Sequence, residues 1–285
     1  MRIAIILFFV FLFSAASPKK ETIPKLGIVG KIEQDSLFYA AGYSAIGESV
    51  DAILSPSLRE EQFLQNIERI KKAKCKLYLC NIFFPGAMKI AGPAVDEEKV
   101  LNYAAVVLAR AKQAGIPVIV LGSGRSRRIP DDYDLVKAKA DFVELFKKIA
   151  LLAKKNGVKI VLESLQSSET NFLNTVHDAA EVVRAVHHQN FQLNADIFHM
   201  MRENEPPENI VAAADVLAHC EIAEKQNRSL PGVQGDDFKP YLRALKQAGY
   251  KGPIFIEATS NNLTAEAPLS FLYLTRQLQE VYAEK

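Results

Sequence analysis

Short apolar runs alternate with longer amphipathic segments along most of this chain. The apolar runs have the length of buried strands, and eight are expected, at residues 26–30, 44–48, 76–82, 117–122, 158–163, 191–197, 216–223 and 253–258. The segments between them are rich in Ala, Leu, Lys and Glu, and the clearest helices are expected at 58–74, 96–114, 134–155, 175–188 and 236–248. Strands that alternate with helices in this number predict a single closed (β/α)₈ barrel of the TIM type rather than an open sheet.

The start of the chain follows a different pattern. A positive Met1-Arg2 pair precedes an uninterrupted apolar run at 3–13, and small residues follow at 14–17. This arrangement is typical of a secretory signal peptide, and the apolar run is too short to cross a bilayer comfortably as a helix. We therefore predict a signal peptide at 1–16 and an exported protein, periplasmic or secreted, with no membrane attachment after cleavage. An uncleaved membrane anchor is the alternative interpretation.

The remaining residues, 24–285, are expected to form one barrel domain, because no repeat or Pro/Gly-rich linker divides them. The chain has 35 Lys and Arg against 33 Asp and Glu, and its basic residues are spread along it, so no nucleic-acid partner is expected. Cys75, Cys80 and Cys220 lack metal-type spacing, and two of them lie inside apolar runs, which favours buried free thiols over a disulfide. The sequence leaves open whether the chain forms a homo-oligomer.

Four acidic residues lie at or near the downstream ends of apolar runs: Glu163 in KIVLE, Asp196 in QLNAD, Glu221 in LAHCE and Glu257 in PIFIE. Their separations of 33, 25 and 36 residues are each about one strand-helix unit, so a parallel barrel brings them to one mouth. Four carboxylates in a confined site need a compensating positive charge to stay ionised together. Because all the ligand atoms would be oxygens, a hard cation, Mg²⁺ or Mn²⁺, is favoured over zinc.

Polar loops follow several of the same strand ends, which is where barrel active sites gather. The loop at 122–128, with the sequence GSGRSRR, has two interpretations. Its backbone N–H groups and guanidinium groups could hold an anion. Alternatively, it is a basic loop that only covers the barrel mouth.

Ordered motifs accompany the four acids in the second half of the chain. They are Glu163 with Glu169 and FLNT after it, Asp196 with His199 in DIFHM, His219 and Glu221 followed by Asn227-Arg228 and Pro231-Gly232, and GPIFIE ending at Glu257. In this order the motifs resemble those of the xylose isomerase-like TIM barrel superfamily. They are most similar to its sugar phosphate isomerases and epimerases, which include ketose 3-epimerases and hydroxypyruvate isomerase.

The resemblance implies roles for individual residues. The positions of the family's metal ligands are Glu163, Asp196, Glu221 and Glu257, and those of its substrate-binding residues are Glu169, His199 and Arg228. It implies a metal-dependent isomerase or epimerase that acts on a small sugar or keto-sugar by proton transfer through an enediolate. In such a mechanism Glu163 and Glu257 are the catalytic pair that removes and returns the proton.

One departure from the family's pattern concerns the third ligand. The epimerases have His there and hydroxypyruvate isomerases can have Gln, whereas this chain has Glu221, and one more residue separates it from Arg228. A further carboxylate should strengthen binding of a hard cation but reduce its Lewis acidity. Two other functions therefore stay open: a metal-dependent dehydratase or lyase on a keto-sugar or inositol derivative, and a carbohydrate-binding barrel without turnover.

Overall fold

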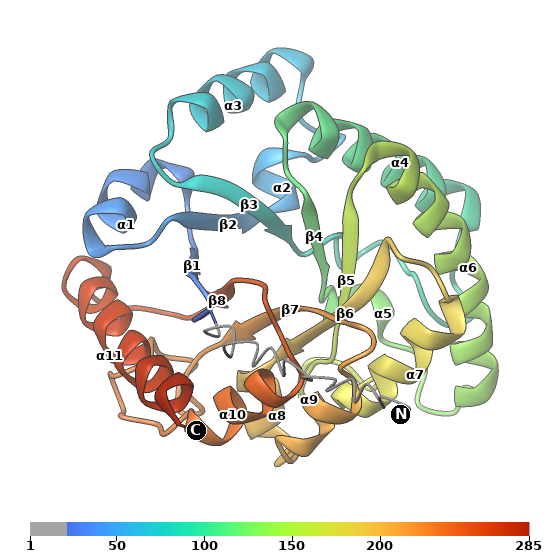
Figure 1. The fold of residues 1–285 in the computed structure, drawn as a ribbon. Coiled ribbons are helices and arrows are strands. Elements are labelled where there is room, and N and C mark those ends of the chain that lie inside the picture. Colours follow the sequence, from blue (N-terminus) through green and yellow to red (C-terminus); the bar gives the residue numbers. More distant parts are fainter. Residues whose placement is uncertain (1–21, 285) are drawn as a thin grey trace, which may run out of the picture.

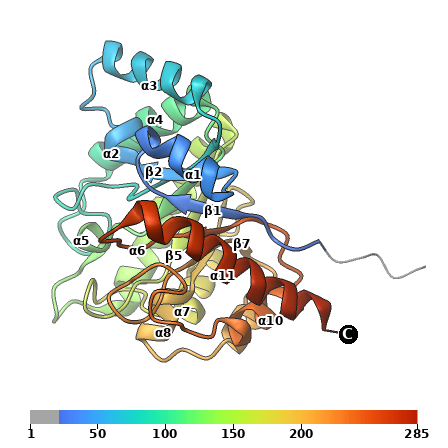
Figure 2. The ribbon, with the colours of Figure 1, turned by 90° about the vertical axis from the view of Figure 1, so that its left-hand side faces the viewer.

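A computed structural model of the protein describes residues 22–284, which form a closed barrel of eight parallel strands (Figure 1). Each strand pairs with the next in chain order, and β8 pairs with β1 to close the ring. The helices lie outside the strands, as the side view in Figure 2 also shows. The (β/α)₈ architecture expected from the sequence is therefore confirmed, whereas the expected signal peptide at 1–16 lies outside the described residues.

The strands begin and end within two residues of their expected positions. They are β1 (Leu26–Val29), β2 (Ala45–Ser49), β3 (Lys76–Asn81), β4 (Val118–Leu121), β5 (Lys159–Glu163), β6 (Phe191–Asp196), β7 (Leu217–Ile222) and β8 (Ile254–Ile256). The end of β6 shows why such bounds shift. Asp196 caps the next helix by accepting a hydrogen bond from the backbone N–H of Phe198, so Ile197 is helical and not part of the strand.

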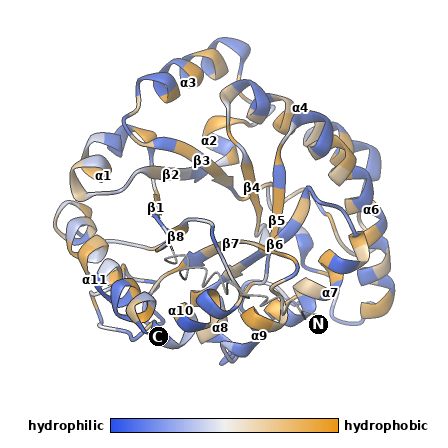
Figure 3. Cartoon of the chain, in the orientation of Figure 1, coloured by the Kyte–Doolittle hydropathy of each residue, from blue (hydrophilic) through white to orange (hydrophobic). Residues whose placement is uncertain are grey.

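The five expected helices are present as α3 (Glu60–Lys72), α4 (Glu97–Ala114), α6 (Leu135–Asn156), α7 (Val176–Val186) and α10 (Lys239–Gln247). Outside those five ranges, the described residues contain further helical elements: η1 (Ile32–Gln34), α1 (Asp35–Ala41), α2 (Val50–Ile53), α5 (Gly124–Arg127), α8 (Ile197–Arg202), α9 (Glu208–Ala212) and α11 (Leu263–Ala283). Most are too short to show a helical period, and α11 contains Pro268, a residue that usually ends a helix. Helices such as α4 and α6 show both hydrophilic and hydrophobic residues (Figure 3), as expected where one face packs on a barrel.

Alternate residues along the strands form two apolar layers. The layer inside the barrel consists of Ala45, Leu79, Val118, Val120, Val161 and Phe255, and their chain neighbours belong to the larger core between strands and helices. Because successive side chains of a strand point to opposite faces, the inward series continues from Val161 to Glu163 and from Phe255 to Glu257. The barrel is therefore filled by apolar side chains up to the C-terminal strand ends, where polar groups begin.

Two further expectations concern the cysteines and the membrane. Cys75, Cys80 and Cys220 are all buried and free, which confirms the expectation of free thiols. Over residues 22–284, none of the helices combines the length and the apolar character that spanning a bilayer requires.

Candidate metal centre

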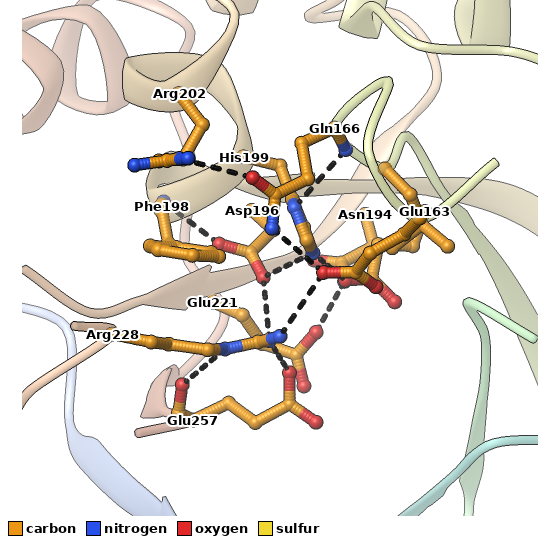
Figure 4. A network of polar contacts seen from close by, with 12 residues as sticks. Glu163, Gln166, Asn194, Asp196, Phe198, His199, Arg202, Glu221, Arg228 and Glu257 are labelled. Atoms are coloured by element: carbon orange, nitrogen blue, oxygen red, sulfur yellow. Dashed lines mark hydrogen bonds and ion pairs between the residues drawn. The ribbon is translucent and has the colours of Figure 1, made fainter. Parts of the chain in front are cut away.

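The four acidic residues meet at the C-terminal mouth of the barrel (Figure 4). Each of Glu163, Asp196, Glu221 and Glu257 offers one carboxylate oxygen, and these oxygens all lie within 4.8 Å of one another. Glu163 and Asp196 end β5 and β6, Glu221 lies near the end of β7, and Glu257 follows β8. The structure therefore brings together the four side chains whose spacing predicted that they would converge.

Barrel register places these side chains on one inner surface. Asp196 pairs with Glu221 across β6 and β7, and Glu163 pairs with Asn194 across β5 and β6. Paired residues of neighbouring parallel strands point to the same face of the sheet. The acids thus project into the same space at the barrel axis, although 94 residues separate the first from the last (257 minus 163).

The cluster has the electrostatic character of a cation site. Burial, together with the charges of the other acids, raises the pKa of both Glu163 and Glu221 well above the ordinary value of 4.5. In each of these two residues Oε1 is buried and accepts no hydrogen bond within the described part of the chain. A hard divalent cation supplies positive charge and binds such oxygens, so the donor set fits Mg²⁺ or Mn²⁺.

Two buried amides contact the acids, and the sequence analysis did not single them out. Nδ2 of Asn194 donates a hydrogen bond to Oε2 of Glu221, and Nδ2 of Asn81 donates one to Oε1 of Glu257. Asn81 is the last residue of β3, and Asn194 lies two residues before the end of β6. An amide at such a position was the available signal, because a buried polar group needs a hydrogen-bond partner.

Arg228 reaches across the mouth to two of the acids. Its Nη2 contacts Oε2 of Glu257 and lies 3.3 Å from Oδ2 of Asp196, while its Nε donates to the backbone carbonyl of Glu257 at 3.0 Å. The guanidinium lies over the ring of Phe198, 4.8 Å from the centroid. Asn227 and Arg228 both adopt left-handed backbone conformations, with φ of 59° and 49°, which turn the loop toward the cluster.

A cavity of about 450 Å³ opens beside the carboxylates, within the size range of small-molecule sites. Glu163, Glu169, Arg228 and Glu257 all line it, so two of the three residues expected to contact substrate border this space. The rest of its wall is formed by Asn81, Ile82, Phe84, Gly86, Gly122, Ser123, Gly124, Arg125, Leu165 and Ser168. The cavity therefore has polar groups near the acids and an apolar side.

His199 is buried next to the cluster and is not among the residues that line the cavity. Its Nδ1 accepts a hydrogen bond from the backbone N–H of Gln166 at 3.2 Å, so the proton of the neutral ring is on Nε2. Burial lowers the pKa of His199, which keeps the ring neutral. Nε2 lies 3.3 Å from Oε1 of Glu163 and 3.6 Å from Oδ2 of Asp196, so the ring is close to both carboxylates, although Nε2 has no hydrogen-bond partner within the described residues.

His219 lies on the inner face of β7, two residues before Glu221. Its Nε2 is 3.7 Å from Oε1 of Glu221, and its ring packs at a tilt on Phe255 with 5.4 Å between centroids. Burial lowers the pKa of His219 to about 3, so the ring is neutral. It therefore separates the acid cluster from the apolar interior without adding charge.

The loop at 122–128 divides its residues between two tasks. Ser123, Gly124 and Arg125 line the cavity. Arg127 is fully buried, and its Nη1 donates a hydrogen bond to the backbone carbonyl of Glu163 at 2.6 Å. Burial lowers the pKa of Arg127 to about 10, and the nearby charges of Glu163 and Glu169 oppose that shift. The loop thus contacts the end of β5 through Arg127 and borders the cavity through Ser123, Gly124 and Arg125.

The chain belongs to the xylose isomerase-like TIM barrel family, whose sequence model matches residues 38–275. It is similar to an L-ribulose 3-epimerase of Methylomonas sp. strain DH-1, with 32% identity over 126 residues that cover 44% of each protein. It is also similar to a putative hydroxypyruvate isomerase of Mus musculus, with 33% identity over 172 residues, which are 57% of this chain and 60% of that protein. These matches span about half the length of the relatives. They confirm the family that the sequence motifs resemble.

Solved structures share the fold over nearly the whole chain. An L-ribulose 3-epimerase superposes with a TM-score of 0.77 at 19% identity, covering 90% of this chain and 95% of its own. The 3-keto-D-glucoside 4-epimerase of E. coli superposes with a TM-score of 0.73 at 16% identity, covering 89% of this chain and 99% of its own. At these identities the likeness shows the architecture alone.

Proposed function

We propose that this protein is a divalent-metal-dependent isomerase or epimerase that acts on a sugar or keto-sugar. The observation that carries the proposal is the cluster of four carboxylates within 4.8 Å of one another, beside a cavity at the barrel mouth. The names of its relatives, L-ribulose 3-epimerase and putative hydroxypyruvate isomerase, support the same class of reaction. Such reactions move a proton on a carbon atom next to a carbonyl group.

In this proposal Glu163, Asp196, Glu221 and Glu257 hold one Mg²⁺ or Mn²⁺ ion. When bound, the ion would act as a Lewis acid that polarises the substrate carbonyl and offsets the negative charge that develops when the neighbouring carbon loses its proton. Arg228 contacts two of the same carboxylates and places a positive charge next to them. The neutral ring of His199 lies beside Glu163 and Asp196 on the buried side.

The proton is moved by Glu163 and Glu257. They come from β5 and β8 and enter the cluster from different sides (Figure 4), so a substrate bound between them meets one carboxylate on each face. Return of the proton to the opposite face of the same carbon gives an epimer, and return to the adjacent carbon gives an isomer.

Glu169 and Arg228 are proposed to orient the substrate. Both line the cavity, and Oε1 of Glu169 is 4.0 Å from Nη1 of Arg228. A carboxylate acceptor beside a planar set of N–H donors suits the alternating hydroxyl groups of a sugar. His199 is the third member of the proposed substrate-binding set, and its Nε2 lies 3.3 Å from Oε1 of Glu163 and 3.6 Å from Oδ2 of Asp196.

The proposal is tested with protein that has been treated with EDTA and then supplied with Mn²⁺. It is incubated in deuterated water with a panel of ketoses and keto-sugar derivatives, and products are analysed by NMR and mass spectrometry. We expect metal-dependent deuterium incorporation with a changed configuration or carbonyl position. Loss of water would indicate a dehydratase or lyase, and sugar binding without exchange would indicate a binding protein; either outcome rejects the proposal.

A further inference from the structure

Two of the four carboxylates have one oxygen held by an amide of the protein. Oε2 of Glu221 accepts a hydrogen bond from Nδ2 of Asn194, and Oε1 of Glu257 accepts one from Nδ2 of Asn81. An amide N–H that points at a carboxylate oxygen occupies one of that oxygen's lone pairs and fixes the rotation of the carboxylate. Each of these glutamates is thereby left with one oxygen that is turned away from the amide.

The other two carboxylates are restricted in different ways. Oδ1 of Asp196 accepts the backbone N–H of Phe198 at 2.8 Å. Oε2 of Glu163 packs against Gly122 so closely that a Cβ atom at that position would lie 2.4 Å from it. The oxygens that remain are Oδ2 of Asp196 and Oε1 of Glu163, and both face the inside of the cluster, where Nε2 of His199 also points.

The contacts of Arg228 do not prevent the remaining carboxylate oxygens from binding a cation. Its Nη2 contacts Oε2 of Glu257 and Oδ2 of Asp196. These are the oxygens to which neither the amide of Asn81 nor the backbone N–H of Phe198 donates. A carboxylate oxygen has two lone pairs, so a hydrogen bond by itself does not keep it from binding a cation. The amides fix direction instead, because Oε2 of Glu221 is turned toward Asn194 and Oε1 of Glu257 toward Asn81. Each of the four side chains therefore presents a single oxygen as a ligand.

Single-oxygen carboxylates suit small cations. Mg²⁺ takes six ligands at about 2.0–2.1 Å in near-octahedral geometry, whereas Ca²⁺ takes about 6–8 oxygens at 2.3–2.6 Å and often uses both oxygens of a carboxylate. Mn²⁺ shares the six-coordinate oxygen environment of Mg²⁺. Four single oxygens would fill four of the six positions around an ion of the first kind and leave two for substrate oxygens.

We propose that Asn81 and Asn194 are positioning residues that hold Glu257 and Glu221 as single-oxygen ligands and so favour Mn²⁺ or Mg²⁺ over Ca²⁺. The inference rests on the metal site of the proposed function. It also explains how Glu221 takes the third ligand position. A glutamate has two equivalent oxygens, whereas an imidazole has one free nitrogen. The hydrogen bond from Asn194 leaves Glu221 with one oxygen for the ion.

A packing role alone does not explain Asn194. The residue is fully buried on an inner position of β6, and its Oδ1 has no hydrogen-bond partner within residues 22–284. A buried amide with one unpaired oxygen is less favourable than an apolar side chain of equal size. Leucine has nearly the same shape and would fill the space, so the N–H bond to Glu221 is what the amide adds.

The test compares metal affinities of the intact protein by calorimetry, with MnCl₂ and CaCl₂ as the two probes. The variants are Asn81→Leu, Asn194→Leu and the double variant. The matched control is Asn209→Leu, since Nδ2 of Asn209 donates to Oε1 of Glu205 at 2.7 Å in an amide–carboxylate pair outside the cluster. We expect each site variant to lower the ratio of Mn²⁺ to Ca²⁺ affinity by about tenfold, the scale found for residues that orient metal ligands.

The outcomes separate the two proposals. Wild-type protein that binds no divalent cation rejects the metal site and the proposed function with it. If the wild type binds Mn²⁺ but the leucine variants keep its affinity ratio, or if the wild type does not prefer Mn²⁺, the amide role is wrong and the metal site stands. Thermal unfolding checks each variant first, and Asn81→Ala or Asn194→Ala replaces any leucine variant that does not fold.

Discussion

Gly122 leaves no room for a side chain beside the carboxylate of Glu163. A Cβ atom at position 122 would lie 2.4 Å from Oε2 of Glu163, a separation that real Cβ atoms do not show. The glycine comes directly after β4, next to the strand that Glu163 ends. The position of one acid in the cluster thus depends on the absence of a side chain on the neighbouring strand.

We predict that Gly122→Ala displaces the carboxylate of Glu163 and weakens Mn²⁺ binding by about tenfold or more. Calorimetric titration of the EDTA-treated variant measures the effect. Gly124→Ala is the control in the same loop, because its Cβ would meet Leu165 and the backbone of Glu169 instead of the acid cluster. Equal affinities for the wild type and Gly122→Ala would show that Glu163 is not a ligand or that the loop adjusts freely.

Removal of charge from single ligands gives a second prediction. Glu163→Gln and Asp196→Asn keep the size of each side chain but remove one negative charge from a buried site. Each should weaken Mn²⁺ binding by about tenfold or more, because an amide oxygen is a poorer ligand for a hard cation. If calorimetry finds unchanged affinity in both variants, the metal centre is not where we place it.

The third prediction separates metal binding from proton transfer. Glu257→Gln retains an oxygen that can coordinate the ion but cannot accept a proton. Metal affinity should fall modestly, while turnover should fall by about 10²-fold or more, the scale of losing an acid-base group. Deuterium exchange at the substrate carbon, measured with the metal-loaded variant, decides the matter. Exchange at the wild-type rate would remove Glu257 from the catalytic pair.

The pH dependence of stability is the fourth prediction. Without metal, the folded-state pKa values of Glu163 and Glu221 lie above the ordinary value of 4.5, so the folded state binds their protons more tightly than the unfolded chain does. The stability from these groups is complete below the unfolded pKa and is lost as the pH rises through the raised folded values. Bound Mn²⁺ favours the ionised carboxylates and removes this loss.

Thermal unfolding measured from about pH 5 to about pH 8, with EDTA and with Mn²⁺, tests this linkage. The difference between the two melting temperatures should widen as the pH rises. A difference that stays constant across the range would mean that the cluster does not change its protonation there.

The fifth prediction concerns the N-terminal leader. The positive start, the apolar run at 3–13 and the small residues after it favour export, with removal of residues 1–16. N-terminal sequencing of protein recovered from the producing cells should find a chain that begins just after Ala16. A soluble cytosolic protein that retains Met1 would reject export.

The sequence was enough to predict the barrel because its signals are local. Each strand is an apolar run, and the helices between them repeat apolar residues at helical spacing. The four acids could be found in the same way, since each stands where an apolar run ends. Those expectations needed only the chain order and the rule that parallel strands bring their C-terminal ends to one edge.

The distances and the partners of each side chain were decided by the tertiary structure. Asn194 donates to Glu221 because strands β6 and β7 are in a register that the sequence does not state, and Asn81 reaches Glu257 across the barrel mouth. The substrate-binding role of His199 stays a prediction, while the fold decided that its Nδ1 accepts the backbone N–H of Gln166 and that its ring lies buried beside the acids. Which lone pair or proton is free depends on contacts between segments far apart in the chain, so the sequence by itself determined which groups gather, and only the fold decided what each one can do.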